Sequence, residues 1–136
     1  MQNKIHHVNA LEAAEIAQKT RDSGNLHLVE IQGKKIQSWE DFYQKMEEGF
    51  RFPTISVNYN AYLDWIEDLD WLGKDGYVLI IHDYKNFLEQ DLLLKDRIME
   101  GFADMILPWW QGDDEDSVVH CVVGGEAKPF NVYLVD

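Results

Sequence analysis

The sequence has little of what would place a protein outside the cell or in a membrane. Cys121 is the only cysteine, so no internal disulfide can form. The longest uninterrupted apolar run covers only residues 77–81, far below the roughly 20 residues that a membrane-spanning helix needs. No charged, then apolar, then small-residue segment typical of a secretory signal is present. These absences predict a soluble protein of the reducing cytoplasm.

Positive charge is also scarce. The 12 Lys and Arg residues face 25 Asp and Glu residues, which gives a formal net charge of -13 at pH 7. Because phosphate groups are bound by clustered cations, this excess of acid argues against direct contact with nucleic acid or with an anionic membrane. It favours a basic protein as the partner, although acidity that only keeps the domain soluble is the simpler alternative.

Motifs for cofactors and metals are missing as well. Gly124-Gly125 lies between two β-prone runs, whereas a nucleotide phosphate loop lies between a strand and a helix. The five histidines show no paired spacing typical of a metal site. The acidic run 113–116 lacks the alternating oxygens and the glycine of a calcium loop. We therefore expect no cofactor and no bound metal.

Four segments have the polar start and the apolar period of amphipathic helices. They cover about residues 10–22, 38–49, 58–71 and 93–106. The first begins with a capping box, Asn9 with Glu12, and the last should end before Pro108, since the residue before a proline avoids the helical region. Trp109 and Trp110 are then expected in a loop, either as an exposed aromatic platform or, the favoured interpretation, closing the core.

Short β-prone runs separate these helices. They lie at residues 26–31, 77–81, 118–123 and 131–135. The run 77–81 is apolar throughout, which is typical of a central parallel strand that is buried on both faces. The run 118–123 could instead pair with the last strand as a hairpin. Strands that alternate with helices predict an α/β fold, a small and mainly parallel sheet covered by helices.

The third helical segment combines many carboxylates with large apolar side chains. On a helix, one face collects Tyr62, Trp65, Ile66 and Leu69, and another collects Asp64, Glu67, Asp68 and Trp71. General acid–base catalysis by these carboxylates would need a concave, partly dry pocket, whereas an exposed helix face leaves them all ionised. No serine lies in a Gly-x-Ser-x-Gly context either, so we expect that the protein is not an enzyme.

The order of these segments and their residues resemble the barstar family of intracellular ribonuclease inhibitors. The likeness covers about residues 26–106 and the last strand. Residues 28–38 look like the family's opening strand, turn and capped helix, residues 58–69 like its inhibitory helix, and residues 78–87 like its second strand and the aromatic segment after it. The family's helix motif is matched by Asn58, Asn60, Ala61 and Asp64.

The resemblance implies a bacterial immunity protein that binds and inhibits a basic ribonuclease toxin as a monomer in a 1:1 complex. Acids of the inhibitory helix would enter the enzyme's active site, where substrate phosphate would lie, and pair with its cationic side chains. Asp64 lies at the position of the family's dominant acid, Asp68 lies one turn further on, and Asp104 matches another acidic contact. The implied partner-binding residues are Asn58, Asn60, Leu63, Asp64, Asp68 and Asp104.

The chain also departs from the family pattern. Asn60 stands where the family often has Asp, Leu63 stands where it often has Trp, and the approach loop 54–57 lacks the usual aromatic and glycine. A cognate enzyme different from barnase is compatible with these changes. Two alternatives to inhibition stay open: an acidic adaptor that keeps the fold without nuclease inhibition and, least favoured, a carboxylate-based hydrolase.

We expect residues 1–136 to form a single domain. Residues 1–24 form an N-terminal helical extension, and residues 108–129 an insertion before the last strand, because neither has a counterpart in the short form of the family. Each segment could add a second contact to the partner or merely cover the sheet and core.

Overall fold

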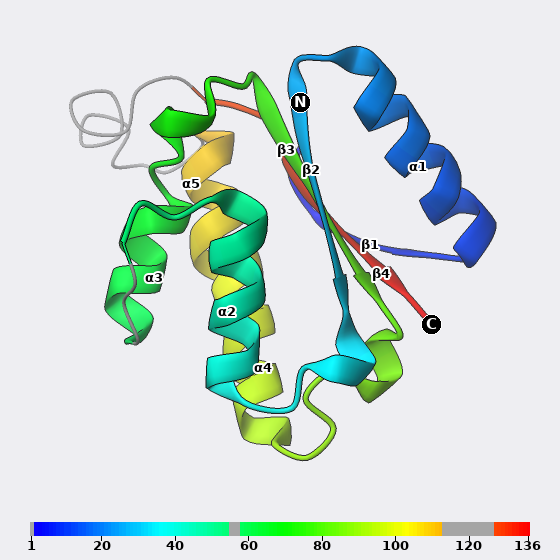
Figure 1. The fold of residues 1–136 in the computed structure, drawn as a ribbon, viewed down its shortest axis with the longest axis vertical. Helices are drawn as coiled ribbons and strands as arrows, with labels where there is room; N and C mark the ends of the chain where they lie inside the picture. The colour runs from blue at the N-terminus through cyan, green and yellow to red at the C-terminus, as the bar shows by residue number, and fades with distance from the viewer. Residues whose placement is uncertain (1, 55–57, 113–126) are drawn as a thin grey trace.

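The computed structural model describes residues 2–54, 58–112 and 127–136, and four parallel strands form its sheet (Figure 1). The strands are β1 (Ile5–Val8), β2 (Leu26–Gln32), β3 (Gly76–His82) and β4 (Phe130–Val135), in the spatial order β1-β4-β3-β2. The predicted α/β class is confirmed. The β-prone run 118–123 lies outside the described residues.

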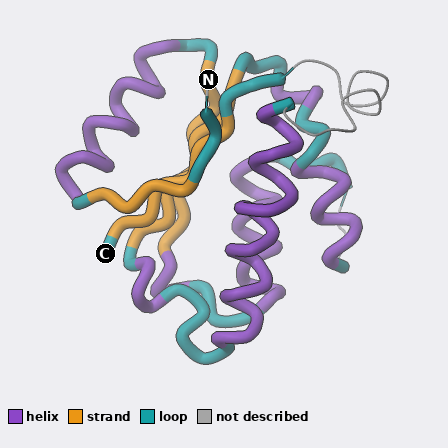
Figure 2. The backbone as a smooth tube through the Cα atoms, turned by 180° about the vertical axis from the view of Figure 1, so that it is seen from behind, coloured by secondary structure: helices purple, strands orange, loops and turns teal. Residues whose placement is uncertain are grey.

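Helices cover both faces of this sheet. They are α1 (Ala10–Ser23), α2 (Trp39–Phe50), α3 (Tyr59–Ile66), α4 (Leu92–Gly101) and α5 (Leu107–Gln111). Figure 1 shows α1 alone on one face, with α2 to α5 on the other, and Figure 2 shows the same division from behind. The described part of the chain therefore has three layers.

β3 lies at the centre because it pairs with β2 on one side and with β4 on the other. Side chains alternate along a strand, so β3 serves two cores. Tyr77, Leu79 and Ile81 belong to the large core beneath α2 to α5, and Val78 and Ile80 belong to the small core beneath α1. This double burial explains why the run contains no charged side chain.

β1 is a strand that the sequence did not predict. It pairs with β4, with Ile5 opposite Val132 and Val8 opposite Val135. His6 stacks on Tyr133 of β4, with 4.6 Å between the ring centroids. Four residues that include two histidines have little local β signal, and the pairing with β4 decides their conformation.

The helix α1 closes the second face of the sheet. The capping box predicted for Asn9 and Glu12 is present, and Gly24 ends the helix in the left-handed conformation at φ 73°. The small side chains of Ala13 and Ala17 are buried, which lets the helix backbone pack closely on the sheet. The structure places β1 at the edge of the sheet and α1 over its second face.

Two helix ends differ from the prediction. α3 ends at Ile66 and not near Trp71, because Leu69 adopts φ 58° and turns its side chain into the core. The long helix does not end before Pro108: α4 continues through a π-helical segment, Phe102–Ile106, into α5. A proline is tolerated in the first turn of a helix, and Leu107 bonds to the carbonyl of Phe102, five residues back.

The tryptophans after this segment are helical and do not form a loop. Trp110 is only 2% exposed and belongs to the large core, and Trp109 packs against the same core. The favoured interpretation of the pair as core residues is therefore confirmed, and the predicted loop at this point is wrong. The acidic run 113–116 lies outside the described residues.

Candidate partner-binding site on α3

The helix α3 begins where the sequence predicts. Asn58 has an extended backbone, and its side-chain oxygen accepts a hydrogen bond of 2.8 Å from the backbone N–H of Ala61. α3 has eight residues, and isolated helices of that length are not stable in water. Its place in the molecule therefore depends on tertiary contacts.

Aromatic and aliphatic packing holds one side of α3. Tyr62 and Ile66 are buried, and the ring of Trp39 on α2 lies close to the rings of Tyr59 and Tyr62. Leu63 is 9% exposed and belongs to the same core. Leu63 is one of the six residues expected to bind the partner, but its side chain lies on the buried side of α3 and packs in the core.

Acidic and amide side chains occupy the other side. Asn60 and Asp64 are exposed on α3, whereas Asp68 is exposed in the turn after it, where its Oδ1 accepts a bond of 3.2 Å from the N–H of Asp70. Within the described ranges, Asp64 and Asp68 form no ion pair. The guanidinium of Arg97 on α4 instead stacks over the Tyr59 ring at 4.2 Å.

Asp104 is exposed on the π-helical segment. One turn before it, Gly101 faces α3 so closely that a Cβ built on it would meet the hydroxyl of Tyr59. Asp104 follows this contact by three residues, on the π-helical segment. Among the described residues, Asp104 forms no ion pair.

Glu67 also lies beside Asp64 and Asp68, but it is not among the six residues that the family resemblance implies as partner-binding. Its side chain is half-buried, and burial, followed by the negative charge of Asp64, raises its carboxyl pKa to about 7. The sequence signal was its place three residues after Asp64 on the polar face. Its burial was not visible there, because it depends on packing at the end of α3.

We expect Glu67→Gln to raise the free energy of unfolding at pH 8 by about 1–2 kcal/mol, a value reduced for partial solvent screening. The folded-state pKa lies above the unfolded value of 4.5, so the stability linked to this carboxyl is present below about pH 4.5 and is lost as the pH rises through about 7. Urea unfolding of both proteins from pH 4 to pH 8 measures the difference. Glu15→Gln, which changes an exposed side chain of α1, is the control. If the difference in unfolding free energy between Glu67→Gln and the wild type did not change with pH, the expectation would be contradicted.

Other carboxylates extend the negative field beyond α3. Burial, followed by the charges of Asp70, Asp68 and Asp75, raises the pKa of Tyr77 to about 12. Asp70 and Asp75 are themselves exposed. The turn after α3 thus continues the acidic surface that begins at Asp64.

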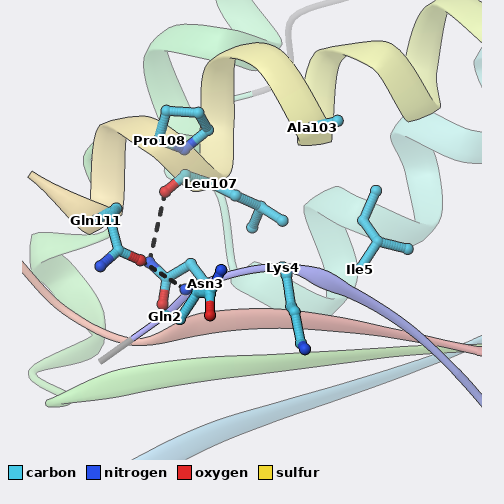
Figure 3. A pocket seen from close by; sticks show the side chains of 8 residues that line it. All are labelled: Gln2, Asn3, Lys4, Ile5, Ala103, Leu107, Pro108 and Gln111. Atoms are coloured by element: carbon cyan, nitrogen blue, oxygen red, sulfur yellow. Dashed lines mark hydrogen bonds between the residues drawn. The ribbon is translucent and has the colours of Figure 1, made fainter. Parts of the chain in front are cut away.

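A cavity of about 380 Å³ lies elsewhere, between the residues that lead into β1 and the α4–α5 helix (Figure 3). Asn3 is one of its polar lining residues, and its side chain already bonds to the chain itself. Its amide group donates to the carbonyls of Leu107 and Lys128, and its oxygen accepts from the N–H of Phe130. These polar atoms hold the N-terminal segment in place. They are not available to orient a ligand, so the cavity is a weaker candidate than α3.

The described residues contain no group of His, Cys, Asp and Glu that could hold a metal ion. In the same ranges, no helix combines the length and the apolar character required to span a bilayer.

Comparison with known proteins agrees with this architecture. The model of the family described as Barstar (barnase inhibitor) matches residues 26–132. No curated protein matches the chain. The matched residues begin at β2, include α3, and end within β4, which leaves β1 and α1 outside the match. Because the family model covers most of the chain, the protein belongs to the barstar family, with the ribonuclease-inhibitor-like role that this family carries.

Proposed function

We propose that this protein is a cytoplasmic immunity protein that inhibits a basic ribonuclease toxin by covering the enzyme's active site with the acidic side of α3. The observation that supports it most is the exposure of Asp64 on a helix whose opposite side is buried. Carboxylates on a helix held in this way are already oriented, so binding costs little reorganisation. The net charge of -13 would also attract a basic partner and speed the encounter.

The chemistry of the proposed contact follows from what a ribonuclease must bind. Its active site needs cationic side chains to hold the phosphates of RNA, and carboxylate oxygens form similar charge-assisted hydrogen bonds with Arg, Lys and protonated His. Asp64 would occupy the central phosphate position, with Asn60 and Asp68 beside it and Asp104 at the α4–α5 side. With these groups in place, RNA cannot reach the catalytic residues, and the inhibitor needs no catalytic group of its own.

The identity of the bound enzyme depends in part on two positions, Leu63 and Asn60. Leu63 offers little surface, and Asn60 brings no charge, so the proposed contact depends more on Asp64 than it would with an aromatic residue and a second acid at these positions. A partner other than barnase, or a weaker complex with barnase, agrees with these two residues.

RNA cleavage in the presence of the purified protein tests the proposal. The probes are barnase and any small basic ribonuclease encoded beside this protein's gene. We expect inhibition that is complete at a 1:1 ratio and that weakens as salt is raised, because salt screens charge pairs at the edge of an interface. Co-expression should also protect cells from the same enzyme. Binding without inhibition would favour the adaptor alternative, and the absence of both binding and protection would contradict the proposed function.

A further inference from the structure

Two neighbouring tryptophans of α5 hold the end of α3. The indole N–H of Trp110 donates to the carbonyl of Ile66 at 3.0 Å, and the indole N–H of Trp109 donates to the carbonyl of Glu67 at 2.8 Å. These tryptophans are 44 and 42 residues away from their acceptors along the chain. The contact therefore forms only in the folded protein, and it lies at the end of α3, two to three residues after Asp64.

The end of α3 needs these donors because its own turn does not supply them. In a regular helix end, backbone N–H groups of the following residues bond to the last free carbonyls. Here the chain turns through Leu69 at φ 58°, the N–H of Asp70 bonds to the side chain of Asp68, and the N–H of Leu72 bonds to the carbonyl of Leu69. The carbonyls of Ile66 and Glu67 are left for the indoles.

The π-helical segment affects which side of α5 faces the end of α3. Successive residues of an α-helix project about 100° apart, so the extra residue in a π turn rotates everything after it by a similar angle. The segment Phe102–Ile106 sets this rotation immediately before α5. Trp110 also lies 5.1 Å from the ring of Tyr77 on the central strand, so the end of α3 is connected through Trp110 to the sheet.

We propose that Trp109 and Trp110 are positioning residues for partner binding, which hold the carbonyl end of α3 so that Asp64 and Asp68 keep the direction needed for a cationic partner. This inference rests on the proposed function of α3 as the binding surface. A binding group has to be held within roughly 0.5 Å of its productive place. A short helix without a fixed end would have to be ordered during binding, which lowers affinity.

Trp109→Phe tests the inference because it keeps an aromatic ring at a half-buried position and removes the N–H donor, together with part of the contact area of the indole. We expect amide hydrogen exchange in α3 to become about 10-fold faster, while exchange in β3 stays unchanged, because local opening is separate from global unfolding. With barnase as the probe, we expect about 5- to 20-fold weaker binding, mostly through faster dissociation.

Trp71→Phe is the matched control. Its indole N–H donates to the carbonyl of Phe50 at 2.9 Å, so the variant removes the same kind of bond from the end of α2. Its ring also lies against Trp65 of α3, and the phenylalanine keeps an aromatic ring at this contact. We expect it to leave both α3 exchange and affinity unchanged. Equal effects in both variants, unchanged α3 exchange in Trp109→Phe, or faster exchange with unchanged affinity would each overturn the inference. If the wild-type protein does not bind barnase, the small basic ribonuclease encoded beside its gene replaces barnase as the probe. If neither enzyme binds, that result counts against the proposed function, and the α3 exchange rates then decide the positioning role.

Discussion

Asp64→Ala is expected to weaken binding to the ribonuclease by about 100-fold or more. Removing one member of an ion pair that is buried in a complex costs about 3–5 kcal/mol, since the other charge is left without a partner. Asp64 is exposed on α3 and forms no ion pair in the described ranges, so its charge is free to meet a cation of the enzyme. Titration calorimetry or inhibition kinetics measures the loss.

The fold should not suffer from this change. Asp64 contributes to the raised pKa of Glu67, so its removal should lower that pKa and stabilise the folded protein slightly above neutral pH. Glu15→Ala on α1 removes an equal charge from the opposite face of the sheet and should alter affinity by less than about threefold, through steering alone. Equal losses in the two variants would mean that overall charge, and not the surface of α3, determines binding.

Deletion of residues 2–24 is expected to abolish cooperative folding, even though the family match begins only at residue 26. Among the described elements, α1 is the cover of the small core, and its loss would expose Val78, Ile80 and Val135 to water. The deletion also leaves β4 as an edge strand and removes Asn3, whose side chain forms three hydrogen bonds. Each large apolar side chain exposed costs about 1.5–3 kcal/mol, so the sum reaches the 5–15 kcal/mol that stabilises a typical domain.

Circular dichroism during thermal unfolding and sedimentation of the truncated chain measure this effect. Ala17→Asp is a smaller disturbance of the same contact, because it places a charge in the buried interface between α1 and the sheet, and it should also destabilise strongly. Leu11→Ser is the control on the same helix, since Leu11 is 69% exposed and its replacement should change little. A truncated chain that stays monomeric and unfolds cooperatively would contradict the role assigned to β1 and α1.

The elements that the sequence predicted correctly have local causes. The helix starts at Asn9, Ser38 and Asn58 depend on side chains that cap the next turn, and all three caps are present. The central strand follows from an apolar run that only a doubly buried strand explains. The missed features depend on distant residues: β1 requires β4 as its partner, and the continuation of α4 past Pro108 requires a π turn that the proline pattern does not reveal.

The candidate site also combines features that the sequence predicts with features that only the tertiary structure decides. The spacing of residues in α3 was enough to separate an acidic side that carries Asp64 from an apolar side that carries Ile66, because helical periodicity is a property of neighbouring residues. Where the helix ends, how deeply Glu67 is buried and what holds the final carbonyls could not be obtained from that spacing. The indoles that hold those carbonyls belong to Trp109 and Trp110, which come from 42 and 44 residues further along the chain and reach α3 only once α5 has packed against it.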